Sequence, residues 1–159
     1  MKFKATLDKL TQILTALVVV VFVALIFFLS NVSQIPIYGR VSLYIGVAIL
    51  FGAYLFYPKY YQVDENSVTV KSPLFSRSIS RTKIIEVKEL PKEELQGSIR
   101  AFGSGGYFGY FGLFYNSQLK WMTWFGTQRK NYVLVRTEKW RYIFTPDNPQ
   151  EFVSALSRS

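Results

Sequence analysis

A run of 17 residues without a charge decides how this chain is organised: ILTALVVVVFVALIFFL, from Ile13 to Leu29. Only Thr15 interrupts its apolar character. A helix of about 17–25 residues crosses the roughly 30 Å of hydrocarbon in a bilayer. In lipid, the backbone polar groups of such a segment have to be satisfied within the segment itself. The run therefore predicts a membrane-spanning helix.

A second uncharged run, VSLYIGVAILFGAYLFY from Val41 to Tyr57, follows after a short loop. Its length predicts a second span. Pro58 predicts the end of that span, because proline cannot continue a helix and restrains the residue before it. The two runs together predict a transmembrane helical hairpin over 13–57. An N-terminal segment, 1–12, precedes it, and a soluble domain over 58–159 follows.

A secretory signal peptide is the alternative for the first run, with Lys2, Lys4 and Lys9 as its charged n-region. The run exceeds the usual h-region of about 7–15 residues, and no A-x-A-like cleavage site follows Leu29. Since a second apolar run comes so soon afterwards, the hairpin is favoured over the signal peptide.

Basic residues flanking the hairpin predict its topology. Three lysines precede the first span and several bases follow the second, whereas the loop 30–41 carries Arg40 alone. An excess of Lys and Arg marks the cytoplasmic side. We therefore expect an integral, multi-pass protein of the cell (inner) membrane with both termini in the cytoplasm. Tyrosines near the span ends are typical of an interfacial aromatic belt: Tyr38, Tyr44, Tyr54, Tyr57, Tyr60 and Tyr61.

Short alternating runs at roughly ten-residue spacing follow Pro58 and predict an antiparallel β-sandwich or barrel. Glu138-Lys139 is the predicted two-residue hairpin turn between the last two runs, with a longer loop or bulge as the alternative. Since all these signals lie after the hairpin, 59–159 is predicted to fold by itself. The predicted strands are Tyr60–Val63, Val68–Lys71, Ser78–Ser80, Ile84–Leu90, Leu119–Phe125, Tyr132–Thr137 and Trp140–Phe144.

The chain ends on a helix signal. Asn148 suits the N-cap, Pro149 the first helical position and Glu151 the third position of a capping box. The apolar residues that follow have helical spacing: Phe152, Val153, Ala155 and Leu156.

This order of elements resembles that of the bacterial pleckstrin-homology (PH) domain membrane proteins, in which a pair of membrane helices precedes a PH-like barrel. The resemblance implies a mainly β domain: a partly open, roughly seven-stranded antiparallel barrel capped by the C-terminal helix. It does not extend to inositol-phosphate binding, because the loop Asp64–Ser67 is acidic where such sites are basic. The residues that carry it are Tyr61–Asp64, Val68–Val70, Ser78–Ser80 with Ile84, Ser98–Gly106, Phe108–Gly112, Pro146–Pro149 and Glu151-Phe152.

Glycines and aromatic residues alternate irregularly between Gly103 and Gly112. The segment matches neither a P-loop nor a dinucleotide-binding fingerprint, so no nucleotide is expected. The glycines favour bulges and close backbone approach in a curved sheet. The aromatic residues also suit an interface loop that docks on the bilayer or a partner. Strand alternation predicts Phe108 and Tyr110 on one face, with Tyr107 and Phe111 on the other, one pair buried and the other exposed. The candidate interface residues are Phe102, Tyr107, Phe108, Tyr110, Phe111 and Phe114.

The soluble part carries 15 basic against 9 acidic residues. Bases near an anionic leaflet gain about 1 kcal/mol each, which favours a surface compatible with the membrane. Because the domain is tethered, a lipid surface is preferred to nucleic acid, and no nucleic-acid partner is expected. The candidate contacts with anionic lipid are Lys59, Arg77, Arg81 and Lys83.

Catalysis has few residues to draw on, because the chain contains no histidine and no cysteine. Glu86 and Glu89, three apart on a predicted strand, point to opposite faces. No cofactor, metal or catalytic group is therefore expected. We expect a non-catalytic membrane-anchored binding or scaffolding module with a protein partner or a second copy of itself. The alternatives are a bilayer-sensing or lipid-interacting component and an accessory subunit of a membrane enzyme or transporter complex.

Overall fold

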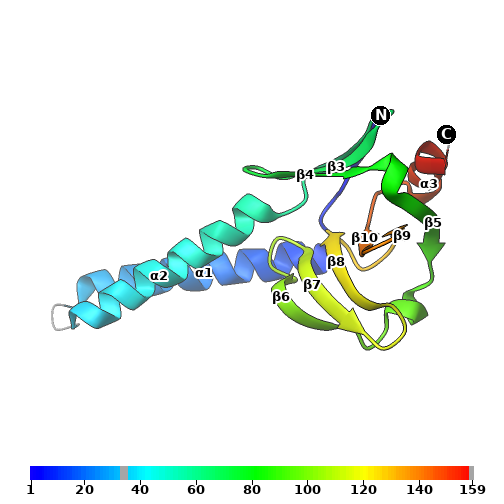
Figure 1. Cartoon of the computed structure of the whole chain (residues 1–159). Helices are drawn as coiled ribbons and strands as arrows, with labels where there is room; N and C mark the ends of the chain where they lie inside the picture. The colour runs from blue at the N-terminus through cyan, green and yellow to red at the C-terminus, as the bar shows by residue number, and fades with distance from the viewer. Residues whose placement is uncertain (33–35, 158–159) are drawn as a thin grey trace.

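The computed structural model describes residues 1–32 and 36–157. A helical hairpin projects from one side of a β-domain (Figure 1), formed by α1 (Lys9–Asn31) and α2 (Ile37–Phe56). Both helices are long and apolar enough to cross a membrane. In each helix, no residue of the most apolar 18-residue stretch is buried. α2 ends before Pro58 as predicted, because Tyr57 is extended, with ψ 142°.

Two sheets make up the β-domain. The first has four strands in the order β1-β2-β3-β4, and the second has six in the order β5-β9-β10-β8-β7-β6. The short helices η1 (Arg81–Lys83) and η2 (Lys92–Leu95) flank β5, and α3 (Pro149–Ser157) ends the fold. The strands are β1 (Lys2–Lys4), β2 (Tyr60–Val63), β3 (Ser67–Lys71), β4 (Ser76–Ser80), β5 (Ile84–Leu90), β6 (Ile99–Gly105), β7 (Tyr110–Asn116), β8 (Lys120–Gly126), β9 (Tyr132–Thr137) and β10 (Arg141–Phe144).

The expectation of about seven antiparallel strands is corrected in two respects. The described residues form ten strands, and β10 pairs in parallel with β8, with Tyr142 opposite Thr123. The three additional strands are β1, which is only three residues long, and β6 and β7, whose glycines weaken the strand signal. The two-residue turn at Glu138-Lys139 is confirmed, since Thr137 N–H donates to Trp140 O at 2.8 Å.

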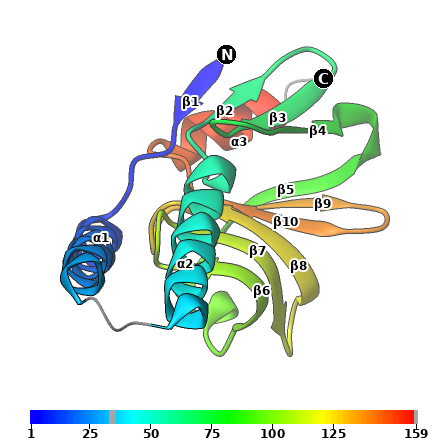
Figure 2. The same ribbon diagram turned by 90° about the vertical axis from the view of Figure 1, so that its left-hand side faces the viewer.

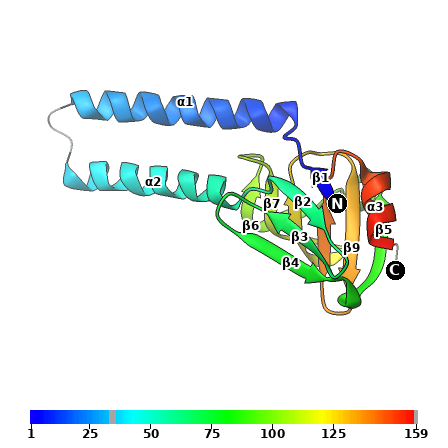
Figure 3. The same cartoon turned by 90° about the horizontal axis from the view of Figure 1, so that it is seen from above.

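β1 and β2 bring the two ends of the hairpin into one sheet. β1 precedes α1, β2 follows α2, and the two strands pair antiparallel with Phe3 opposite Tyr61 (Figure 3). Just beyond this register, Val63 N–H donates to Met1 O at 2.8 Å. Tyr61 was predicted in an interfacial belt, and this is wrong: it is fully buried. Its position in the sheet, next to β1, turns its ring into the core.

The six-stranded sheet has an apolar core on each face. On β9, Val133 and Val135 face the core shared with the four-stranded sheet and α3, whereas Leu134 faces the core beneath η2. This division follows the two-residue period of a strand. The start of α3 is as predicted, since Phe152 N–H donates to Asn148 O at 3.1 Å. Figure 2 shows β6, β7 and β8 side by side, on the other side of β9 and β10 from α3.

Candidate functional site

The turn between β6 and β7, residues 106–109, lies against both helices of the hairpin. Phe108 N–H donates to the Thr15 hydroxyl of α1 at 3.0 Å. The Phe108 ring centroid lies 5.2 Å from that of Tyr54 and 5.6 Å from that of Tyr57, at the end of α2. This turn of the β-domain therefore packs between the two helices, near the start of α1 and the end of α2.

The turn holds this position through left-handed backbone conformations. Gly106 and Gly109 have φ +141° and +117°, and Phe108 has φ +53°. Gly106 N–H donates to Gly109 O at 2.9 Å, and the Ser104 hydroxyl both donates to Tyr107 O and accepts from Tyr107 N–H. A non-glycine residue in this region costs about 1–3 kcal/mol and is found where the surroundings over-determine it. Here the contacts of Phe108 with the hairpin do so.

Two glycines opposite each other allow β6 and β7 to cross closely. Gly103 pairs with Gly112, and a Cβ added to Gly103 would lie 2.1 Å from Phe111 O. The register also shifts between Arg100 and Phe102, which marks a bulge. The close backbone approach predicted from the glycines is thus present, whereas the bulge lies at Ala101, just before them.

The predicted interface aromatics differ in how deeply they are buried, and this burial does not alternate along the chain. Phe102 is 78% exposed, and Tyr107 and Phe108 are half-buried at the turn. Tyr110 and Phe111 are both buried, so the predicted split into one buried and one exposed pair is wrong. The reason is that 106–109 form a turn, which breaks the strand period. Phe114 is also buried. Docking of the exposed members on a bilayer or partner stays a prediction.

Of the four bases predicted to contact anionic lipid, Arg77 and Lys83 line one pocket, which Lys59 and Arg81 do not line. Lys59 is exposed directly after α2, Arg77 is exposed on β4, and Lys83 is exposed on η1. Arg81 donates to Asp64 O at 3.3 Å and to Leu156 O at 3.1 Å. The Arg81 guanidinium therefore holds the end of α3, where a cation is favoured by the helix dipole.

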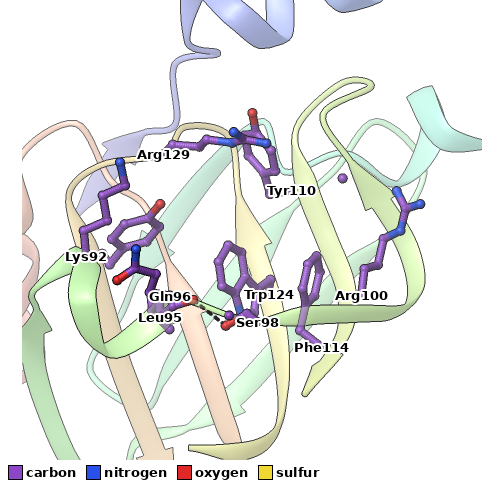
Figure 4. Close-up of a pocket in the computed structure, with 12 residues that line it drawn as sticks. Lys92, Leu95, Gln96, Ser98, Arg100, Tyr110, Phe114, Trp124 and Arg129 are labelled. Carbon is purple, nitrogen blue, oxygen red and sulfur yellow. Dashed lines mark hydrogen bonds between the residues drawn. The ribbon is translucent and has the colours of Figure 1, made fainter. Parts of the chain in front are cut away.

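A pocket of about 520 Å³ opens beneath η2 (Figure 4). Its wall includes Phe114 stacked on Trp124, with ring centroids 4.6 Å apart. Among the described residues, the charged side chains that line it are all cations, and none is a carboxylate. The lining comes from η2, β6, β7, β8, β9 and the β8–β9 connection, a convergence for which the sequence has no local signal. The lining residues are Lys92, Leu95, Gln96, Gly97, Ser98, Arg100, Gly105, Tyr110, Phe114, Trp124, Arg129 and Tyr132.

Tyr132 supplies a phenol that stays protonated at neutral pH. Burial raises the pKa of Tyr132 to about 12; nearby Arg129 lowers it, while Tyr110 and Asp8 raise it further. The Arg129 guanidinium also lies 4.9 Å from the ring centroid of Tyr110, within cation–π range. The Arg129 side of the pocket therefore carries the Arg129 cation and two phenolic groups, with the Asp8 carboxylate nearby.

Asp8 connects this pocket to the start of α1. Its carboxylate accepts Thr11 N–H at 2.7 Å as the N-cap of the helix, and Arg129 N–H at 3.0 Å. Asp8 N–H donates to Thr127 O at 3.2 Å. Sequence analysis missed this role, although an Asp directly before an apolar helical run is an N-cap signal.

The carboxylates considered for catalysis are surface groups. Glu86 forms salt bridges with Lys88 at 3.1 Å and Arg136 at 3.5 Å, and its hydrogen bond with Lys88 is the main reason that the pKa of the Glu86 carboxyl is lowered. Glu89 accepts a hydrogen bond from Gln150 at 3.2 Å. Within residues 1–32 and 36–157, no group of three or more potential metal ligands occurs.

Two packed sheets, a C-terminal helix against their shared core and an open pocket at one end define a small PH-like β-domain. A family model of the bacterial PH domain matches residues 59–159, and the chain belongs to that family. β1 and the hairpin lie outside the matched residues. No curated protein matches the chain, and no solved structure does.

Proposed function

We propose that this chain is a membrane-anchored, non-catalytic binding or scaffolding module, with α1 and α2 spanning the membrane and the PH-like domain at its cytoplasmic face. The pairing of β1 with β2 carries the proposal. Because the chain enters α1 from one strand of a sheet and leaves α2 into the next strand, both helix ends belong to the same side. The lysines and arginines that flank the hairpin favour the cytoplasm.

A binding role is supported by what the domain offers. The chain contains neither histidine nor cysteine, the usual nucleophile or general base of catalytic pairs. The domain is also held at the base of the hairpin without a flexible linker, since Pro58 is buried and Lys59 N–H donates to Lys71 O at 2.8 Å. Such a module presents its surfaces at a fixed height above a bilayer.

Because the chain contains no cysteine, its topology can be tested by labelling single introduced cysteines. Lys83→Cys places a thiol on the exposed η1 of the domain, and Ile37→Cys places one at the far end of the hairpin. A membrane-impermeant maleimide should label Lys83→Cys only in inverted vesicles and Ile37→Cys only in right-side-out vesicles. Labelling of both from the same side would reject the spanning hairpin, and the reverse pattern would reject the cytoplasmic orientation.

Affinity purification tests the binding role itself. The full chain, extracted in mild detergent, should retain a specific protein or lipid. The control is a hairpin whose apolar sequence has been scrambled, and it should not retain this molecule. Mass spectrometry of both samples makes the comparison. Identical sets of co-purifying molecules would count against a binding module.

A bilayer-sensing role is the second candidate, and the position of Phe108 against both helices favours it. Movement of α1 against α2 would change the contacts of Phe108 with Thr15 and Tyr54. In bilayers of different thickness, amide exchange in β6 and β7 should then change for the native chain but not for Phe108→Ala. Phe102→Ala, at an exposed position on β6, is the control and should behave as the native chain does. Exchange that is independent of thickness in the native chain would exclude this role.

A further inference from the structure

Among the residues that the structure describes, two buried hydrogen-bond donors of the pocket beneath η2 have no partner. These are the Tyr110 hydroxyl and the Trp124 indole Nε1, in residues that are 3% and 6% exposed. A buried polar group without a partner costs about 1–3 kcal/mol, and such groups are few in native proteins. Both donors belong to side chains that line one cavity, which points to a ligand that brings acceptor atoms.

Three cations from separate elements surround the same cavity. Lys92 lies on η2, Arg100 on β6 and Arg129 in the connection between β8 and β9 (Figure 4). Among the described residues none of the three forms a salt bridge, and Asp8, the carboxylate beside Arg129, is already engaged by two backbone N–H groups. A site with several cations, free donors and no carboxylate in its lining is complementary to an anion.

The aromatic wall indicates that this anion carries an organic body. Phe114 stacks on Trp124, and the Tyr132 ring lies 5.8 Å from that of Trp124. The cavity of about 520 Å³ is far larger than an inorganic ion needs and falls in the range of small-molecule sites. Arginine and lysine are the usual partners of phosphate oxygens.

We propose that this pocket binds a phosphate ester. Its phosphate lies beside Arg129, between Lys92 at one end of the pocket and Arg100 at the other, and accepts a hydrogen bond from the Tyr110 hydroxyl. A second acceptor of the ligand meets Trp124 Nε1, and the organic body covers the ring of Phe114. The pocket is separate from the loop Asp64–Ser67, which is acidic and lies in the other sheet.

A lipid headgroup is one source of such a phosphate ester, and this step rests on the proposed membrane anchoring. Asp8 caps α1 and is bonded to Arg129, so the Arg129 side of the pocket lies next to the start of the first helix. In an anchored chain, this side is near the headgroups. A soluble phosphate ester from the cytoplasm is the other source. Both present the same phosphate chemistry to the pocket.

Binding to the purified full chain tests the pocket. In neutral detergent, titration with glycerol 3-phosphate reports the soluble ester. Nanodiscs of phosphatidylcholine with or without phosphatidylglycerol report the lipid, by native mass spectrometry. We expect Lys92→Gln, Arg100→Gln and Arg129→Gln combined to weaken binding by more than about tenfold. The charge-matched control combines Lys88→Gln, Lys120→Gln and Lys139→Gln, at exposed positions that do not line the pocket, and should change binding less than about twofold.

Tyr110→Phe provides a second variant that keeps the ring and removes one unpartnered donor. It should weaken binding by about threefold or more while the melting temperature of the unliganded chain stays the same or rises. Binding of phosphatidylglycerol alone assigns the lipid source, and binding of glycerol 3-phosphate alone assigns the soluble source; either supports the pocket. No binding of either, or equal losses in both triple variants, overturns it. The detergent titration is independent of topology, so its failure is distinguishable from failure of the cysteine-labelling test.

Discussion

Two buried tyrosines show how the partner of a single hydroxyl decides its contribution to stability. The Tyr61 hydroxyl donates to Phe125 O and accepts Thr145 N–H at 3.3 Å, whereas the Tyr110 hydroxyl has no partner among the described residues. We predict that Tyr61→Phe lowers the free energy of unfolding by about 1–3 kcal/mol. Tyr110→Phe should leave it unchanged or raise it. Urea unfolding of the full chain in detergent, followed by near-ultraviolet circular dichroism, measures both; equal losses would contradict the assignment.

Tyr132 should make stability depend on alkaline pH. Burial raises its pKa from 10.0 to about 12, so between these values the folded chain keeps a proton that the unfolded chain releases. The folded state is then favoured fully below pH 10 and progressively less as the pH rises toward 12. The melting temperature of the native chain should therefore fall more steeply above pH 10 than that of Tyr132→Phe. Parallel curves would show that this phenol does not contribute. Burial also raises the pKa of Tyr61, so some slope should remain in the variant.

At the scale of elements, the crossing of β6 and β7 depends on glycine. At Gly103 a Cβ would meet Phe111 O at 2.1 Å, and φ is +108°. Gly103→Ala should lower the free energy of unfolding by more than about 2 kcal/mol, because the clash is with backbone and adds to the conformational strain. Gly97→Ala is the matched control. It also has positive φ, +75°, but nothing lies within 4 Å of its Cβ, so a loss of about 1 kcal/mol is expected. Similar losses at both positions would contradict the close approach.

β1 contributes more to the core than its three residues suggest. Phe3 is 5% exposed and packs edge-on against Phe152, with ring centroids 5.1 Å apart. Phe3→Ala should cost about 3–5 kcal/mol, as for buried aromatics in general, whereas Lys4→Ala, at an exposed position in the same strand, should cost little. Thermal unfolding of the full chain compares them. The fragment 59–159 lacks β1, so we expect it to be less stable than the full chain. Equal stability would show that β1 adds nothing.

Local signals in the sequence account for the elements that were predicted. The alternation of Ile84–Leu90 and the cap at Asn148-Pro149 are contained within a few residues, and both elements form. The burial of Tyr61 depends instead on β1, which joins it from the far side of the hairpin. The phosphate-ester pocket likewise needs Arg100 and Arg129 to converge through the pairing of β6, β7 and β8. No single-sequence pattern encodes such pairings.

At the scale of the whole molecule, several contacts tie the hairpin to the β-domain. Before α1, Thr6 donates to the Asp147 carboxylate through its N–H at 3.1 Å and through its hydroxyl at 2.6 Å. At the end of α2, the ring of Phe56 stacks on that of Phe75, with centroids 4.4 Å apart. The turn between β6 and β7, which carries Phe108, adds contacts with both helices. Hairpin and domain therefore form one unit, so a load on either helix reaches the sheets directly.

The pairing of β1 with β2 also sets an order of events during synthesis. β1 emerges from the ribosome first, but its partner strand follows both helices, so the four-stranded sheet closes only after the hairpin is made. With the hairpin spanning the membrane as proposed, closure further requires that the two strands end on the same side of the membrane. A chain with one helix inserted the wrong way leaves Phe3 on the opposite side and the edge of β2 uncovered. Uncovered strand edges promote aggregation, and they mark a chain for proteolysis. In the proposed arrangement, completion of this sheet thus depends on the correct insertion of both helices.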